Sequence, residues 1–337
     1  MRKLLLCLCA VLLALVVSGC SIFEKQPSKK IGISFGAGPA ARWAQERVFM
    51  EEHAKSLGLE PIVRFNTTDK PKTQQEDCKE LIDSGISVLI IMPRDGRNFT
   101  ETVKYARSKN VKVIAYARPF INQNADLFIG YDNYRLGQTE GLYAIEMVRN
   151  GNYIILKGDK ADNNSIALYD GIMKHVQPAT ASGVNIILDD FVPGWSPEKA
   201  KDMVRAALIK NNKKIGAILA PNDKIAGASI EVLKELGITN RVIVTGMDGE
   251  LPAIKRIAND EQHMSVYLHL KDFAITAVDQ AKSFIDKKEF SVNSEFVGEN
   301  GLKTPSYLVS GKVITKETIN KFIIEPGVYT KEQVYGK

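Results

Sequence analysis

The stretch RVIVTGMDGELPAIKRI, residues 241–257, decides the fold that the sequence predicts. Its apolar, β-branched opening at residues 242–244 is typical of a strand buried on both faces of a parallel sheet. A Thr-Gly pair ends this run, and Asp248 follows almost at once. A helix is expected to begin near Pro252, because proline is favoured in a first helical turn. This order places Asp248 at the carboxyl end of a parallel strand, where open α/β sheets bind small molecules.

The same pattern recurs along the rest of the chain. The run IGAILA at residues 215–220 leads directly into Asn222 and Asp223. From Lys30 onward, strand-like runs alternate with helical segments, which predicts an α/β architecture of doubly wound parallel sheets. The expected strands of the first half are 30–35, 61–66, 88–92 and 111–116; those of the second are 127–130, 153–156, 184–189, 215–220 and 242–244. The sequence therefore predicts two sheets of similar size.

Length and composition limit the classes of protein to consider. With 337 residues, the chain is longer than one hydrophobic core usually supports, so two domains are expected. Hydrophobic residues at 45% and charged residues at 25% are ordinary values for a globular protein. The 45 basic residues barely outnumber the 39 acidic ones, and none of their runs could follow a phosphate backbone. Charge therefore gives no reason to expect a nucleic-acid partner.

The first twenty residues have the form of an export signal. Two basic residues precede an apolar core at residues 4–17, and small residues form a cleavage site before Cys20. This core is shorter than the roughly 20 residues of a membrane-spanning helix. Cysteine directly after Ser-Gly resembles a bacterial lipobox, so we expect residues 1–19 to be a signal peptide and residues 20–29 a tether lipidated at Cys20. A plain secretory signal with an incidental cysteine is the alternative.

Cys78 is the one cysteine that remains once the signal and Cys20 are set aside, so no intramolecular disulfide is expected. It lies in an amphipathic helical pattern at residues 73–84. A small packing residue is the favoured interpretation, and a nucleophile is the alternative.

Signals for catalysis are weak. The loop GAGPAA at residues 36–41 is similar to a dinucleotide fingerprint, but Pro39 lacks the backbone donor that a pyrophosphate needs. A loop that lets a ligand approach the backbone is therefore favoured over a nucleotide site. The histidines are scattered without metal-ligand spacing, and no Gly-x-Ser-x-Gly motif occurs. We expect neither a cofactor nor an enzyme.

Both tryptophans of the chain lie at predicted strand-to-helix turns, one in each half. Trp43 begins the first helix with Arg42, and Trp195 lies in the loop VPGWSP just before another helix. A flat apolar face from each lobe would suit a pyranose, whose C–H faces are apolar. Two unrelated packing tryptophans are the alternative.

Polar residues that could bind the hydroxyl groups of such a ligand gather at the same predicted sheet edges. Planar and charged side chains suit hydroxyl groups because they offer several donors or acceptors at once. Any one of them could instead cap a helix, and Arg118 could act as a structural hinge residue. The candidates are Arg42, Arg118, Asn163, Asn164, Asn222 and Asp248.

The chain matches one family motif by motif. The matching stretches are Arg42-Trp43, VLIIMP at 88–93, YDN at 131–133, DNN at 162–164, GWSPE at 194–198, ND at 222–223, Asp248 with IKRI at 254–257, and NGLK at 300–303. From about residue 30 to the C-terminus, the chain resembles the type I periplasmic sugar-binding proteins of ABC importers. Within that family, it is most similar to the members that bind D-xylose.

The resemblance implies a type I periplasmic binding protein fold, in which two doubly wound lobes are joined by a hinge of three chain crossings. Lobe I would comprise residues 30–118 and 249–289, and lobe II residues 119–248 and 290–337. The crossings would lie near Arg118, Asp248 and Glu289.

The resemblance also implies a function without cofactor or catalysis. Such a protein captures a monosaccharide between its lobes and presents it to the permease of an ABC importer. In this chain it would be anchored to the membrane through Cys20, and a chemoreceptor is a further possible partner. Trp43 and Trp195 would supply the stacking faces, and the hydrogen-bonding set would be Arg42, Arg118, Asn164, Asn222 and Asp248.

Three positions depart from the family pattern and leave the ligand open. Ala117 replaces an aspartate, Met247 a glutamine and Leu268 a lysine. Each change removes polar groups, and a missing hydrogen-bond partner costs about 1–3 kcal/mol. Xylose, another pentose or hexose, and a less polar ligand such as a nucleoside are all compatible with the sequence.

Two other classes of protein are weighed against this one. A ligand-responsive transcription regulator shares the fold, but it would need a DNA-binding helix-turn-helix where this chain has a signal and tether. A nucleotide-dependent enzyme would need residues 36–41 to hold a pyrophosphate. A cytoplasmic location would favour the first, and nucleotide binding the second.

Overall fold

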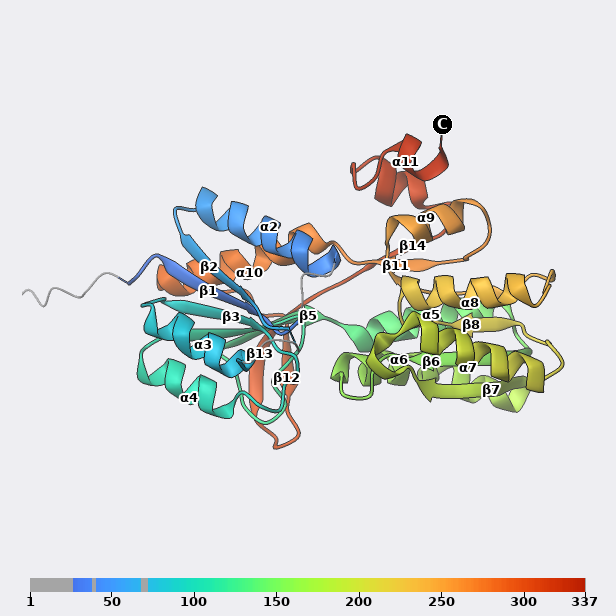
Figure 1. Ribbon diagram of the computed structural model, residues 1–337, viewed down its shortest axis with the longest axis horizontal. Helices are drawn as coiled ribbons and strands as arrows, with labels where there is room; N and C mark the ends of the chain where they lie inside the picture. Colours follow the sequence, from blue (N-terminus) through green and yellow to red (C-terminus); the bar gives the residue numbers. More distant parts are fainter. Residues whose placement is uncertain (1–26, 38–40, 68–71, 337) are drawn as a thin grey trace, which may run out of the picture.

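The computed structural model describes residues 27–37, 41–67 and 72–336. The predicted signal peptide, Cys20, most of the tether and part of the loop at residues 36–41 lie outside these residues. Two lobes lie side by side along the long axis of the molecule (Figure 1). None of the described helices combines the length and the apolar character that crossing a membrane requires.

Lobe I is built on a seven-stranded sheet with the strand order β12-β13-β5-β4-β3-β1-β2. All neighbouring strands are parallel except β12 and β13, which are antiparallel. Helices α2 and α10 pack together, as do α3 and α4 on the other side of the sheet (Figure 1). The strands are β1 (Lys30–Phe35), β2 (Glu60–Phe65), β3 (Val88–Met92), β4 (Lys112–Tyr116), β5 (Leu127–Tyr131), β12 (Ser294–Val297) and β13 (Lys303–Val309); the helices are α2 (Ala41–Ser56), α3 (Gln74–Asp83), α4 (Thr100–Ser108) and α10 (Leu270–Ile285).

Lobe II has a four-stranded parallel sheet, β7-β6-β8-β9, and a separate small sheet, β10-β11-β14. Helices α5 and α6 pack together, as do α7 and α8. The strands are β6 (Gly151–Lys157), β7 (Val184–Phe191), β8 (Ala217–Leu219), β9 (Ile243–Val244), β10 (Met247–Asp248), β11 (Ser265–Tyr267) and β14 (Lys312–Ile314). The helices are α5 (Asn133–Met147), α6 (Asn163–Ala179), η1 (Thr180–Ser182), η2 (Pro193–Trp195), α7 (Pro197–Lys210), α8 (Asp223–Glu235), α9 (Leu251–Ala258), η3 (Asn320–Ile324) and α11 (Lys331–Tyr335).

The predicted fold class is confirmed, but the positions of the chain crossings need correction. Strand β5 pairs with β4, and β13 pairs with β5, so both extend the lobe I sheet. Strand β11 pairs with β10, which keeps α9 and β11 in lobe II. The chain therefore crosses after β5, β11 and β13, and not at the predicted boundaries 118/119, 248/249 and 289/290. For the same reason the two sheets differ in size, because β5, β12 and β13 all join the first.

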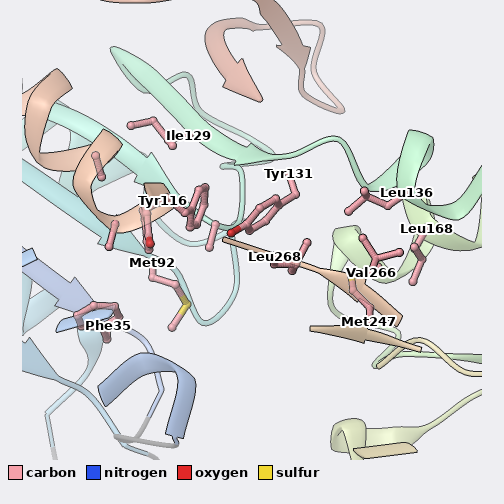
Figure 2. Packing of buried hydrophobic residues seen from close by; sticks show 14 of the residues in the cluster. Phe35, Met92, Tyr116, Ile129, Tyr131, Leu136, Leu168, Met247, Val266 and Leu268 are labelled. Atoms are coloured by element: carbon pink, nitrogen blue, oxygen red, sulfur yellow. The ribbon is translucent and has the colours of Figure 1, made fainter. Parts of the chain in front are cut away.

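An apolar core runs without interruption from one lobe into the other. Tyr116 stacks on Phe273 and Tyr131 packs against it at a tilt, with ring centroids 4.5 and 4.3 Å from that of Phe273. From Tyr131, the same buried cluster continues through Leu268 to Met247 in lobe II (Figure 2). Leu268 and Met247 thus belong to the packed interior of the hinge, and Ala117, the third position that departs from the family pattern, lies in the same cluster.

Cys78 packs inside lobe I, as expected for a packing residue. Its side chain is fully buried against Leu81 and Val103, and burial raises the pKa of its thiol to about 12. Because the thiolate is the reactive species, the folded protein should not react with Ellman's reagent at about pH 8. A protein that begins after Cys20 should instead release one equivalent of dye on denaturation. Rapid labelling of the folded protein would contradict this prediction.

Candidate binding site

The structure distributes the predicted ligand residues over both lobes. Lobe I carries Arg42 and Trp43 at the start of α2 and Arg118 just after β4. Lobe II carries Asn163 and Asn164 at the start of α6, Trp195 in η2, Asn222 at the N-cap of α8 and Asp248 in β10. Each of these residues lies at or beyond the carboxyl end of a strand. The sequence predicts this placement, because parallel strands bring their carboxyl ends to one edge.

Arg42 connects the two lobes electrostatically. One of its Nη atoms lies 3.7 Å from Oδ1 of Asp248, and about a quarter of each side chain is exposed. Its Nε donates a hydrogen bond to Oε1 of Glu46 at 2.7 Å, one helical turn further along α2. Burial works against the charge of Arg42, but Glu46, Tyr131 and Asp248 outweigh it and raise its pKa. Arg42 is therefore a permanent cation between the lobes.

Glu46 fixes the direction of Arg42 from the interior of lobe I. It is fully buried, and its Oε2 accepts a hydrogen bond from the hydroxyl of Tyr116 at 2.7 Å. Burial raises the pKa of Glu46, and the neighbouring Arg42 opposes that rise. Neither Glu46 nor Tyr116 is among the residues predicted from the sequence. The spacing of Glu46 four residues after Arg42 on the same helix face was the available signal.

A second ionic contact between the lobes joins Arg118 to Asp162. The Arg118 guanidinium lies 2.9 Å from Oδ2 of Asp162, whose side chain is only 9% exposed. Asp162 also caps α6, because its Oδ1 accepts the backbone N–H of Asn164 at 3.0 Å. Asp162 is not among the ligand residues predicted from the sequence. Its place before two asparagines at a helix start could have identified it as a cap.

A third contact between the lobes involves Asn164. Its Nδ2 donates a hydrogen bond to the backbone carbonyl of Ala117 at 2.9 Å. Ala117 has a φ of 62°, a left-handed conformation that is uncommon for alanine. Two of the predicted residues, Arg118 and Asn164, thus each make a contact across the two lobes, with Asp162 and with the main chain of Ala117 respectively.

The two tryptophans lie in separate lobes, as predicted. Trp43 packs against Phe35 with ring centroids 6.1 Å apart, and the guanidinium of Arg42 lies 4.6 Å from its ring centroid. Trp195 lies on the main chain of Gly158, where an added β-carbon would be 2.2 Å from the ring. Its buried Nε1 has no hydrogen-bond partner among the described residues. That the two rings face one ligand remains a prediction.

Asn222 caps a helix, the alternative role that its place in the sequence also predicted. Its Oδ1 accepts the backbone N–H of Ile225 at 2.9 Å and caps α8. The cap uses the oxygen of the amide and does not involve its Nδ2. The next residue, Asp223, is almost fully buried. Burial, together with the smaller effect of the nearby negative charge of Asp248, raises the pKa of Asp223 to about 7. Burial also raises the pKa of Asp248 to about 6, although Arg42 opposes the rise.

Hollows in the structure lie beside these contacts. Asn163 and Arg118 border a narrow gap of about 10 Å³, and Asn163 and Asn164 border a hollow of about 160 Å³ with Tyr131. A hollow of about 260 Å³ lies elsewhere in lobe I, beside Arg94, and none of the predicted ligand residues lines it. We locate the site by the polar contacts between the lobes, because these bring together the groups that can bind hydroxyls.

The three departures from the family pattern are all buried. Ala117 is 5%, Met247 6% and Leu268 2% exposed, and all three belong to the apolar cluster that crosses the hinge. They therefore replace polar groups by packing contacts.

In the described residues, no three His, Cys, Asp or Glu side chains gather where they could hold a metal ion.

A family model described as a periplasmic binding protein domain matches residues 31–289. This chain belongs to the periplasmic binding protein family. The resemblance drawn from the motifs is thus confirmed, and with it the two-lobed architecture. The family model and the two D-xylose-binding relatives reported below are binding proteins by name, so we describe this chain as a binding protein and not as an enzyme.

Individual relatives span almost the whole of this periplasmic binding protein. The D-xylose-binding periplasmic protein of Haemophilus influenzae is 32% identical over 308 residues, which cover 91% of this chain and 92% of that protein. The D-xylose-binding periplasmic protein of Escherichia coli is 31% identical over 335 residues, or 99% of each chain. A solved ABC transporter solute binding protein from Clostridium phytofermentans with bound β-D-glucose superposes with a TM-score of 0.81 at 25% identity, covering 90% of this chain and 99% of that one.

Proposed function

We propose that this protein captures a monosaccharide, D-xylose or a related sugar, between its lobes and delivers it to an ABC importer. The observation that carries the proposal is the meeting of Arg42 with Asp248 and of Arg118 with Asp162, each pair drawn from both lobes. Guanidinium and carboxylate groups are suited to several sugar hydroxyls at once. The names of the two D-xylose-binding relatives support a pentose in particular.

The mechanism follows from the two-lobed arrangement. A ligand that contacts both lobes favours the closed arrangement over the open one, and only this difference in affinity can shift the equilibrium. Arg42 reaches the site from α2 while Asp248 reaches it from β10, so a sugar bound to both would tie the lobes together. Trp43 and Trp195 would cover the apolar faces of the ring. The permease of the importer then recognises and binds the closed arrangement of the two lobes.

Anchoring and delivery are further parts of the proposal. A lipid chain on Cys20 would hold the protein at the membrane surface in the cell envelope, with residues 20–29 as the tether. The named periplasmic relatives support a location outside the cytoplasmic membrane. Presentation of the bound sugar to a chemoreceptor is compatible with the same closed state. Metabolic labelling with a fatty-acid analogue in wild type and in a Cys20→Ala variant would test the anchor.

The function is tested by a tryptophan-fluorescence titration of the protein that begins after Cys20. Pentoses, hexoses and nucleosides are added in turn, and emission is followed to saturation. Trp43 and Trp195 are the two tryptophans of the chain, so a ligand held between them should change emission directly. Saturable change with one sugar would support the proposal and identify the ligand. A response to a nucleoside but to none of the sugars would indicate that the replacements at Ala117, Met247 and Leu268 have changed the class of ligand that the site binds.

Sugar affinity is expected to fall by about tenfold between pH 7.5 and pH 5. The pKa of Asp248 is raised to about 6, so its carboxylate is ionised at pH 7.5 and about one-tenth ionised at pH 5. The ionised form is the stronger acceptor for sugar hydroxyls, so affinity is lost as pH falls through 6. Isothermal titration calorimetry across this range measures the effect. An Asp248→Asn variant should show a flat profile, and an equally flat wild type would contradict the assignment.

A further inference from the structure

The backbone at Asp248 is strained. Its φ is 101°, a conformation that residues other than glycine rarely adopt, and Gly249 follows with a φ of 66°. A β-carbon added to Gly249 would lie 2.6 Å from the ring of Tyr267, so the turn also packs closely against β11. Strained backbone of this kind persists only where the surrounding structure over-determines it. The contacts of the next two residues reveal what holds Asp248.

The carboxylate of Asp223 binds the turn from the interior of lobe II. Its Oδ2 accepts the backbone N–H of Glu250 at 2.9 Å. The same oxygen accepts the hydroxyl of Ser265 at 2.9 Å, and the hydroxyl oxygen in turn accepts the backbone N–H of Gly249 at 3.1 Å. Asp223 is 1% exposed and Ser265 is fully buried. Both backbone donors that follow Asp248 are thus held by one buried carboxylate, directly or through one hydroxyl.

Asp223 is itself held from the opposite side. Its Oδ1 accepts a hydrogen bond from Nε2 of Gln262 at 2.9 Å. Arg256 donates from Nε to Oε1 of Gln262 at 3.0 Å, and from Nη2 to the backbone carbonyl of Asp223 at 2.8 Å. The carboxylate therefore has partners on both oxygens, and its orientation is fixed by residues that follow the turn in sequence. Buried polar networks that are satisfied in this way are rigid.

We propose that Asp223 is a positioning residue: it clamps the turn after Asp248 and so directs the Asp248 carboxylate at Arg42 of the other lobe. The effect passes through the main chain of residues 249 and 250, because Asp223 is too deeply buried to touch a ligand itself. The consequence for sugar affinity rests on the proposed function, whereas the clamp does not. Asn222 and Asp223 thus have separate tasks, since Asn222 caps α8 and Asp223 shapes a turn in another element.

A purely structural role for Asp223 makes different predictions. Asp223 is the first residue of α8, where a carboxylate is favourable because of the partial positive charge of the helix end. Loss of that interaction alone would destabilise lobe II without acting on the turn. The clamp instead predicts a local change at Gly249 and Glu250, and an effect on binding that requires the Asp248 carboxylate.

The first experiment needs no ligand. Backbone amide hydrogen exchange is measured by NMR in wild type and in Asp223→Asn, which lacks one of the acceptor oxygens. The Gly249 and Glu250 amides are expected to exchange at least tenfold faster in the variant, while the core of lobe I is unchanged. Should Asp223→Asn fail to fold, Ser265→Ala carries the same test, because it removes the direct partner of the Gly249 amide.

Glu140→Gln is the matched control. Glu140 is also a fully buried acid of lobe II near Asp223 and Asp248, but its hydrogen-bond partner is the hydroxyl of Thr245, at 3.0 Å. The Glu140→Gln substitution should leave the Gly249 and Glu250 amides as well protected from exchange as they are in wild type. Equal protection of both amides in wild type, Asp223→Asn and Ser265→Ala would overturn the proposal.

The second experiment is a double-mutant cycle on sugar affinity. Asp223→Asn should weaken binding about tenfold in the wild-type background and have almost no effect in an Asp248→Ala background. The same tenfold loss in both backgrounds would show that Asp223 acts independently of Asp248, and would overturn the positioning role. If wild type binds none of the sugars, the proposed function fails, while the exchange experiment still decides whether the clamp exists.

Discussion

Replacement of Asp248 by alanine is expected to weaken sugar binding by about 100-fold or more. The change removes a carboxylate that can accept hydrogen bonds from two hydroxyls, each worth about 1.5–3 kcal/mol for a charged acceptor. It also leaves the Arg42 cation without its partner in lobe II, from which it lies 3.7 Å away. Ligand and protein contacts between the lobes are therefore lost together. Isothermal titration calorimetry at about pH 7.5 measures the loss.

The control for this variant is Asp202→Ala. Asp202 also belongs to lobe II, but its side chain is 84% exposed and pairs with Arg205 on the surface of α7. Surface pairs of this kind contribute at most about 1 kcal/mol to stability, so affinity for sugar should not change. An Asp248→Ala protein that binds the same sugar with wild-type affinity would remove Asp248 from the site.

Arg118→Ala is expected to reduce affinity by roughly 30- to 100-fold, and to favour the open arrangement of the lobes. The variant leaves Asp162 without its cationic partner at a position that is 9% exposed, and an unpaired buried charge costs several kcal/mol. We expect less than the full cost, because a quarter of the Arg118 side chain is exposed. Arg118 and Asp162 belong to different lobes, so the loss raises the free energy of the closed arrangement relative to the open one.

Two measurements separate the contributions of Arg118. Calorimetry gives the affinity, and small-angle X-ray scattering with and without saturating sugar gives the degree of closure. Arg118→Lys is the matched variant: it keeps the charge but loses the planar fork, so it should retain part of the affinity. An Arg118→Ala protein that closes on sugar as wild type does would show that the Arg118–Asp162 contact does not contribute to closure.

The sequence predicts local structure well where short-range signals decide it. Strand β3 has the predicted bounds because its apolar run is bordered by a turn on one side and proline on the other. Helix α9 begins beside Pro252 as the first-turn preference requires. The division of Trp43 and Trp195 between the lobes was also predictable, since it depends only on the order of strands along the chain.

Properties that depend on distant pairing could not be predicted in the same way. The sequence of β5 is compatible with a buried strand in either lobe. Only its pairing with β4 and β13 assigns it to lobe I. The contact of Asp223 with Glu250 joins residues 27 positions apart, and that of Glu46 with Tyr116 joins residues 70 apart. Neither spacing corresponds to a helical or strand period. Such partners become visible only when the fold is known.

The division of each lobe among separate segments of chain has a consequence for biosynthesis. The lobe I sheet is completed by β12 and β13, and β14 completes the small sheet of lobe II. Neither lobe can therefore finish folding until nearly the entire polypeptide has left the ribosome. Contacts between such distant residues also form slowly, because long loops must close first. For the export that the proposed location in the cell envelope requires, late completion would prolong the period in which the translocation machinery can accept an unfolded substrate.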